Sequence, residues 1–278
     1  MTTLLTLKNL TLNHPHKTIF QDVTFTLNKG DKIGVLGLNG HGKTSLFNII
    51  AEKVKPDTTV PPFIYDKNKD FSFFYVPQEL TATDQWCIED YYYHFHPHAY
   101  QLKMRLNTLA EKLSQSDADY EKLLDEQSQI FEELDHIKDH DSFDRYLNYL
   151  VMFGVNDLSR KVASLSGGEQ RKICLSLGLS SNAEIILWDE PTNHLDFDTI
   201  EQFEEELTNS QKTLMIISHD RSLLTNVVDR IIHIQKGKLK SFSGTYNAYL
   251  EYLQNEDLRL KKEVDKLTNI QRRENCLD

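Results

Sequence analysis

The chain has 278 residues, with 42 Asp and Glu against 31 Lys and Arg, and a formal net charge of −11. It is long enough to bury a substantial core, and no apolar run approaches the roughly 20 residues of a membrane span, so we expect no membrane insertion and one large α/β domain with an insertion. Three cysteines at unrelated spacings and a strand-like start without a signal peptide predict a reducing, cytoplasmic location.

The first predicted strands cover residues 1–12 and 17–28 and are joined by a turn at His14-Pro15-His16. We expect them to form an antiparallel layer. A third strand, Asp31–Leu36, leads into a glycine-rich loop, and a helix over 44–52 follows it.

The glycine-rich loop has the sequence Gly37-Leu-Asn-Gly-His-Gly42-Lys43-Thr44. Its glycines let the backbone turn N–H groups onto a triphosphate, while Lys43 reaches the outer phosphates and Thr44 can ligate Mg²⁺. The loop therefore predicts a nucleotide site.

The next strand, Phe71–Val76, ends in Pro77-Gln78, and the amide oxygen of Gln78 can join a metal or water shell. An interval rich in helical signals follows, and Ser116 with Asp119 resembles a helix start. Apolar residues step by 3 and 4 on both sides of this break, at Ala99, Leu102, Leu106, Leu109 and Leu113, and at Tyr120, Leu123, Ile130, Leu134 and Ile137. Two such helices with a short turn predict an antiparallel hairpin, an arm over residues 97–140.

The segment Leu165–Gln170 opens a further helix with a serine and two glycine amides, which is a second anion-binding end. Because the glycine-rich loop already satisfies its own phosphates, this segment most simply serves a nucleotide held by another domain. Together, the glycine-rich loop and the Leu165–Gln170 segment predict that two domains of this kind pair head to tail and enclose ATP between them.

Two more buried strands deliver polar residues at their carboxyl ends. Ile185–Trp188 is followed by Asp189, placed to hold Mg²⁺, and by Glu190, placed to polarise the attacking water. Thr213–Ile217 is followed by Ser218-His219, and His219 can reach the γ-phosphate.

In order along the chain, these elements resemble the nucleotide-binding domain of the ABC superfamily. The resemblance makes Gly37–Ser45 the Walker A loop, Gln78 the Q-loop, Leu165–Gln170 the signature, Ile185–Glu190 the Walker B strand, Asn193–Asp196 the D-loop and His219 the switch histidine. The implied fold is an α/β P-loop NTPase core with an antiparallel β layer and a helical subdomain that carries the arm. The resemblance implies ATP contacts from Gly37, Asn39, Gly40, Gly42, Lys43, Thr44 and Ser45, and metal ligation by Thr44, Gln78 and Asp189. It implies catalytic roles for Glu190, His219 and Gln78, and contact with a partner's ATP by Ser166, Gly167, Gly168 and Glu169.

Two positions depart from the family pattern. His14 lies where the family usually places an aromatic residue that stacks on adenine, and a plain turn histidine is an equal alternative. Glu169 stands where most signatures have glutamine, so it brings a carboxylate near the partner's phosphate.

The branch of the superfamily is indicated by Asn193-His194 before Leu195-Asp196, a form typical of the ABC-F proteins, which act on ribosomes. The segment Ser243–Leu250 resembles the Gly-x-Tyr-x-x-Tyr stretch after the first ATPase domain of that branch. The resemblance implies a Mg²⁺-dependent ATPase whose partners are a second ABC domain, in the same chain or a homodimer, and the ribosome with its rRNA or tRNA.

For the domain organisation we expect an ATPase domain over 1–254, with a helical subdomain over 79–164. Residues 255–278 are expected to start a basic helical interdomain linker that is truncated, and a solvated helix face explains the basic residues equally well. A natural single-domain protein that homodimerises is the alternative to a truncated chain.

Two other function classes are alternatives. The ATPase subunit of a transporter would present a groove to a membrane partner, and ribosome or membrane co-sedimentation separates it from an ABC-F protein. An ABC ATPase in DNA repair would carry zinc-binding cysteine pairs or very long coiled coils between the Walker motifs, and the sequence has neither.

Overall fold

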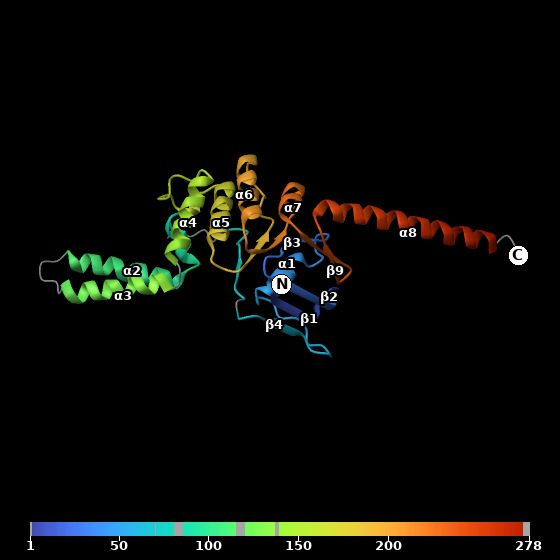
Figure 1. Cartoon of the computed structure of the whole chain (residues 1–278), viewed down its shortest axis with the longest axis horizontal. Helices are drawn as coiled ribbons and strands as arrows, with labels where there is room; N and C mark the ends of the chain where they lie inside the picture. Colours follow the sequence, from blue (N-terminus) through green and yellow to red (C-terminus); the bar gives the residue numbers. More distant parts are fainter. Residues whose placement is uncertain (1, 70, 81–85, 115–119, 137–138, 275–278) are drawn as a thin grey trace. The chain divides into compact units, whose positions relative to one another are not determined.

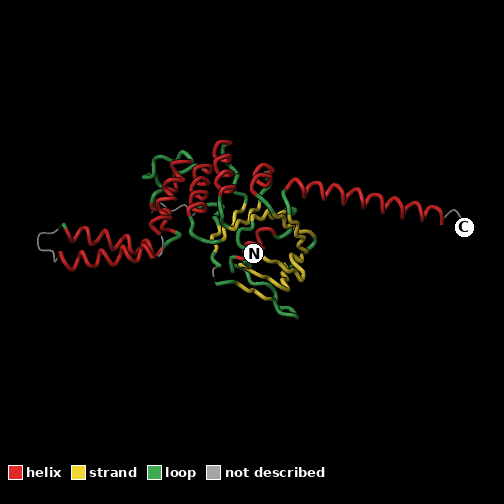
Figure 2. The backbone as a smooth tube through the Cα atoms, in the orientation of Figure 1, coloured by secondary structure: helices red, strands yellow, loops and turns green. Residues whose placement is uncertain are grey.

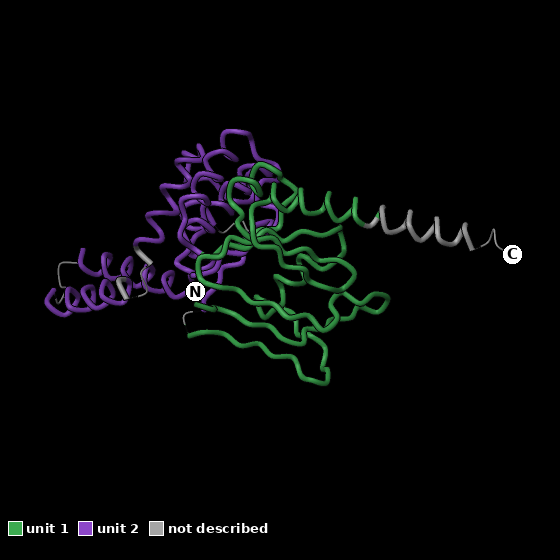
Figure 3. The backbone as a smooth tube through the Cα atoms, turned by 45° about the vertical axis from the view of Figure 1, so that its right-hand side comes forward, with its two compact units in different colours: residues 1–69, 213–278 green, residues 70–212 purple. Residues whose placement is uncertain are grey.

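The computed structural model describes residues 2–69, 71–80, 86–114, 120–136 and 139–274. The chain forms two compact units, which Figure 3 shows in different colours. Unit 1 contains residues 1–69 and 213–278, and unit 2 contains residues 70–212. The predicted boundaries at 79, 164 and 254 follow a different division and stay predictions.

Unit 1 contains a three-stranded antiparallel sheet in the order β2-β1-β4. Its strands are β1 (Thr3–His14), β2 (Lys17–Asn28) and β4 (Ile64–Lys67). Leu5, Leu7 and Leu10 of β1 are fully buried, so one face of the sheet supplies core side chains. The predicted antiparallel layer is confirmed, with β1 running two residues further than expected.

The parallel strands of unit 1 lie in the order β7-β3-β8, and β9 pairs antiparallel with β8. Their bounds are β3 (Lys32–Leu36), β7 (Thr213–Ile217), β8 (Arg230–Gln235) and β9 (Lys238–Ser243). Helix α1 (Lys43–Ile50) follows β3, and α7 (Arg221–Val227) follows β7. All five residues of β7 are buried, as the continuous apolar run predicted.

Helix α8 (Tyr246–Glu274) follows β9 in unit 1. Its first turns are fastened to β8 and β9, because the hydroxyl of Tyr249 lies 2.8 Å from Nδ1 of His233 on β8 and its ring packs on Phe242 of β9. The expected start of the linker at residue 255 falls inside this helix. Most side chains beyond Arg259 lie outside the described residues, so the basic linker stays a prediction.

In unit 2 the short strand β5 (Phe73–Tyr75) pairs in parallel with β6 (Ile185–Asp189), which is buried throughout. Three helices accompany these strands: α4 (Asp139–Met152), α5 (Gly167–Ser180) and α6 (Phe197–Asn209). Helix α5 approaches β6 closely at Gly178, where an added Cβ would lie 2.4 Å from the ring of Trp188. Two 3₁₀ turns are also present: Asp90–His94, which precedes α2 along the chain, and Val162–Ser164, which lies between α4 and α5.

The predicted arm is present in unit 2 as α2 (Pro97–Leu113) and α3 (Tyr120–His136), which lie side by side in Figures 1 and 2. The hairpin has a small core of its own, formed by Leu102, Leu109 and Ile130 with Leu106, Leu123 and Leu134 packed against it. The turn with the predicted helix start at Ser116 and Asp119 lies outside the described residues. The expected end at residue 140 is already inside α4.

Aromatic side chains fill the base of the arm. The ring of Tyr92 stacks on His96 with centroids 4.0 Å apart, and Trp86 packs edge-on against Tyr100 of α2. Lys103 pairs with Asp90 at 2.6 Å and lies over the ring of Tyr93. These contacts pack the Tyr91–His98 segment at the base of the arm.

Among the described residues, no helix has both the length and the apolar character needed to cross a bilayer.

Candidate functional site

In unit 1 the phosphate-binding candidates lie between β3 and α1. Gly42 has the left-handed φ of 101°, and a Cβ there would lie 2.5 Å from Ile19, so only glycine fits. Lys43 donates from Nζ to the carbonyl of Gly37 at 2.8 Å, which holds its charge over the loop. The loop is thus closed by its own lysine and has the form that a phosphate-binding loop requires.

His219 shares an edge of the sheet with this loop. Strand β3 pairs in parallel with β7, Val35 standing opposite Ile217, so the loop and His219 follow the carboxyl ends of adjacent strands. Ligands of open α/β sheets bind at this end. His14 is exposed at the end of β1, and its contact with adenine stays a prediction.

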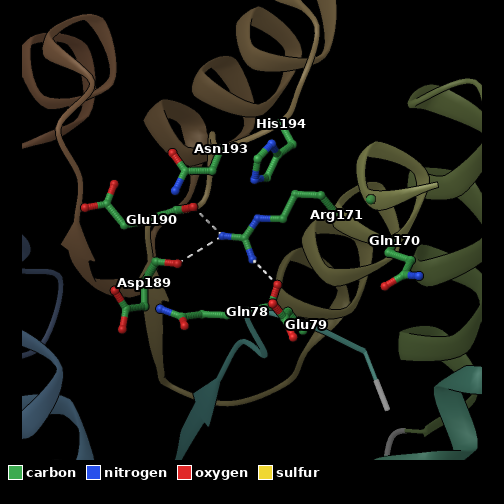
Figure 4. A pocket seen from close by; sticks show the side chains of 9 residues that line it. Gln78, Glu79, Gln170, Arg171, Asp189, Glu190, Asn193 and His194 are labelled. Atoms are coloured by element: carbon green, nitrogen blue, oxygen red, sulfur yellow. Dashed lines mark hydrogen bonds between the residues drawn. The ribbon is translucent and has the colours of Figure 1, made fainter. Parts of the chain in front are cut away.

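In unit 2 a cavity of about 360 Å³ gathers most of the remaining candidates (Figure 4). It is lined by Gln78, Glu79, Gly167, Gln170, Arg171, Asp189, Glu190, Asn193 and His194. The cavity brings the Q-loop and the start of the signature helix together with the Walker B end and the D-loop, which follow one another within residues 189–194.

The parallel pairing of β5 and β6 explains why Gln78 and Asp189 meet. Phe73 stands opposite Ile185 and Tyr75 opposite Leu187, so both strands deliver their next residues to the same cavity. The hydroxyl of Tyr75 donates to Oδ2 of Asp189 at 3.1 Å, and burial together with this carboxylate raises the pKa of Tyr75. Tyr75 therefore stays a donor that orients the buried Asp189.

Glu190 turns the chain sharply out of β6, with a left-handed φ of 48° that is rare for a residue with a side chain. Figure 4 shows its carboxylate directed away from the guanidinium of Arg171, while its carbonyl receives a hydrogen bond from that guanidinium. Glu190 is only partly buried, as a residue that handles water must be.

Arg171 is the main site residue that sequence reasoning missed. It is 6% exposed and donates to five carbonyls, those of Pro77, Gln78, Asp189, Glu190 and Pro191, at 2.6–3.3 Å. Burial lowers the pKa of its guanidinium. One signal was available: this cation precedes Ile173, Cys174 and Leu175 in a helix that is buried on nearly every face.

The signature helix α5 begins with a capping box. The amide of Glu169 donates to Oγ of Ser166, and the amide of Ser166 donates to the Glu169 carboxylate at 2.9 Å. Arg160 pairs with that carboxylate and is the largest cause that lowers the pKa of Glu169 to about 2. Glu169 thus has an intrachain role that the sequence analysis did not foresee.

The D-loop is fixed to the same helix. Asp196 caps α6 by accepting from the amide of Thr199 at 2.9 Å, and it pairs with Lys172 of α5 at 2.9 Å. Signature and D-loop therefore form one connected surface within unit 2.

The comparison with known families decides the identity. Residues 20–193 match the family described as ABC transporter. The chain belongs to the ABC transporter family. The predicted fold class and the predicted ATPase activity are thereby confirmed.

Curated relatives of this ABC domain support the predicted branch. This chain is 31% identical over 250 residues to "ABC transporter F family member 2" of Arabidopsis thaliana. The match covers 88% of this chain and 36% of the relative. It is 29% identical over 253 residues to the "Energy-dependent translational throttle protein EttA" of Escherichia coli, covering 90% and 44%. The chain spans less than half of the length of these relatives, and the predicted resemblance to ABC-F proteins is confirmed.

Solved structures agree on the fold. An "ATP binding subunit of ABC transporter" has a TM-score of 0.63 at 18% identity, covering 93% of this chain and 99% of that one. A dimeric ATP-binding cassette bound to ADP and phosphate after hydrolysis has a TM-score of 0.57 at 20% identity, with coverages of 86% and 98%.

Proposed function

We propose that this chain is the first ATPase domain of an ABC-F protein that acts on ribosomes. The observation that carries the proposal is the cavity of unit 2, in which the Walker B end carries the Asn193-His194 form of the D-loop next to the signature helix. The names of the ABC-F and EttA relatives support the translational role. The arm on α2 and α3 supports a contact surface separate from the nucleotide.

For the chemistry we propose that residues Gly37–Ser45 bind the phosphates of ATP. Glu190 orients and deprotonates the attacking water, and His219 contacts the γ-phosphate. Gln78 completes the water or metal shell. Ser166, Gly167 and Gly168 contact the ATP that is bound by a second ABC domain. This second domain belongs to the same full-length chain or to a second copy.

We propose that hard oxygen donors of this chain hold Mg²⁺ together with ATP: the hydroxyl of Thr44 in unit 1, and the buried carboxylate of Asp189 and the amide oxygen of Gln78 in unit 2. Mg²⁺ in nucleotide sites needs only one or two protein ligands besides phosphate. When bound, the ion neutralises charge on the phosphates. Tyr75 holds the carboxylate that would face it.

Co-sedimentation separates this function from that of a transporter subunit. The chain, incubated with Mg²⁺ and ATP, is expected to pellet with ribosomes and to stay in the supernatant with membrane vesicles, which agrees with the cytoplasmic location we propose. Recovery with the vesicles alone would favour the transporter subunit.

A further inference from the structure

The signature helix carries a negative charge at the end that we propose faces a phosphate. The hydroxyl of Ser166 donates to Oε2 of Glu169 at 2.8 Å, and its amide donates to the same oxygen at 2.9 Å. A serine hydroxyl has a single proton. In this arrangement that proton is directed at a carboxylate of the same chain.

Arg160 holds the carboxylate from its other side. Nη1 of Arg160 pairs with Oε1 of Glu169, and Nη2 lies 3.4 Å from Oε2. The side chains are 39% and 34% exposed, so this is a half-buried pair with forked geometry and not a fully solvated one. The pairing with Arg160 lowers the pKa of Glu169, so the carboxylate is charged at physiological pH and the guanidinium compensates this charge.

The electrostatic consequence concerns an incoming phosphate. An uncompensated carboxylate at a helix start repels a phosphate that the helix amides attract. With Arg160 in place the pair is neutral, and the guanidinium competes with Ser166 for the carboxylate oxygens, which leaves the hydroxyl proton easier to redirect.

We infer that Arg160 is a positioning residue of the signature, which neutralises Glu169 so that Ser166 can engage the γ-phosphate held by the partner domain. This inference rests on the proposed role of the signature. Arg160 itself contacts neither ATP nor the reacting atoms.

The test measures ATP turnover per molecule as a function of protein concentration, and the concentration of half-maximal turnover reports pairing. Arg160→Ala is expected to raise this concentration roughly five- to tenfold with maximal turnover within about twofold. Arg160→Lys keeps the positive charge but cannot pair with both carboxylate oxygens as a guanidinium does. Its concentration of half-maximal turnover is expected to lie between those of Arg160→Ala and the parent.

A second substitution distinguishes this role from a purely structural one. Glutamine at position 169 preserves the capping box but carries no charge. Arg160→Ala combined with Glu169→Gln is therefore expected to restore pairing to within about twofold of the parent. Lys67→Ala, which removes the cation from the solvated pair with Glu52 in unit 1, is the matched control and should have no effect.

The outcomes separate the two proposals. If Arg160→Ala pairs like the parent, or if Glu169→Gln does not rescue it, the role of Arg160 is wrong. Ser166→Ala tests the underlying role of the signature and is expected to weaken pairing by itself. If Ser166→Ala has no effect, or if turnover of the parent is independent of concentration, both proposals fall.

Discussion

Nη2 of Arg171 donates to the carbonyl of Glu190 at 2.6 Å, so a residue of the signature helix fixes the backbone of the residue that we propose as catalytic base. The same guanidinium nitrogen donates to the carbonyl of Asp189 at 3.0 Å, and Nη1 donates to the carbonyls of Pro77 and Gln78. Signature, Q-loop and Walker B end therefore share one buried donor in unit 2.

Replacement of Arg171 by methionine should be costly, because it removes a buried donor from five carbonyls. We expect the free energy of unfolding to fall by about 2–4 kcal/mol, measured by chemical denaturation. ATP turnover per folded molecule should fall as well, because Gln78 and Glu190 lose their anchor.

Arg145→Met is the matched control for this prediction. Arg145 also donates to a helix carbonyl, that of Ser180 at 2.9 Å, but it does not line the Gln78–Glu190 cavity. It should cost stability and leave turnover per folded molecule unchanged. Equal loss of turnover in both variants would contradict the anchoring role of Arg171.

Glu190→Gln keeps the size of the side chain and removes its basicity. ATP binding should remain, hydrolysis should fall by on the order of 10² or more, and ATP-closed pairs should accumulate. A phosphate-release assay measures the loss of hydrolysis, and equilibrium titration measures the retained ATP affinity. Glu79→Gln is the control, because it removes a charge from the same cavity at a residue without a proposed role. If Glu190→Gln hydrolyses ATP at the parent rate, another residue is the catalytic base.

The sequence predicts the parallel strands and the arm well, because each is a local pattern. The apolar runs of β6 and β7 and the 3- and 4-residue steps of α2 and α3 depend only on neighbours in the chain. Arg171 could not be placed in this way, since its acceptors Pro77 and Asp189 lie 94 and 18 positions away. The same holds for the hydroxyl of Tyr75, 114 positions from Asp189.

A shortened arm should leave the ATPase intact, because the hairpin core is formed within α2 and α3. The structure suggests removal of residues 107–131 and closure with a short flexible loop, which keeps Tyr100 and Lys103 at the aromatic base and Arg105 near Glu133. ATP affinity should match the parent within a few-fold by equilibrium titration. Unfolding of the variant or loss of nucleotide binding would mean that the segment belongs to the core.

The stability of the chain should depend on pH through Lys212. Burial, and next the charge of Arg145, lower the pKa of its amine from 10.5 to about 8 in the folded chain. Between pH 8 and 10.5 the unfolded chain therefore binds more protons, so this group makes stability rise with pH, by up to about 1.4 kcal/mol per unit. The free energy of unfolding of the parent and of Lys212→Met can be measured by denaturation at several pH values across this range. Plotted against pH, the two should differ in slope by this amount, and equal slopes would contradict the prediction.

The most direct test of the central claim is the nucleotide dependence of ribosome binding. Glu190→Gln, with the full arm or with residues 107–131 removed, is centrifuged with ribosomes in Mg²⁺ and either ATP or ADP. We predict that the full-arm protein pellets with ribosomes in ATP and is released in ADP, and that the shortened arm strongly reduces the pelleted fraction. Equal recovery in ATP and ADP, or no recovery with ribosomes in either, would contradict the account.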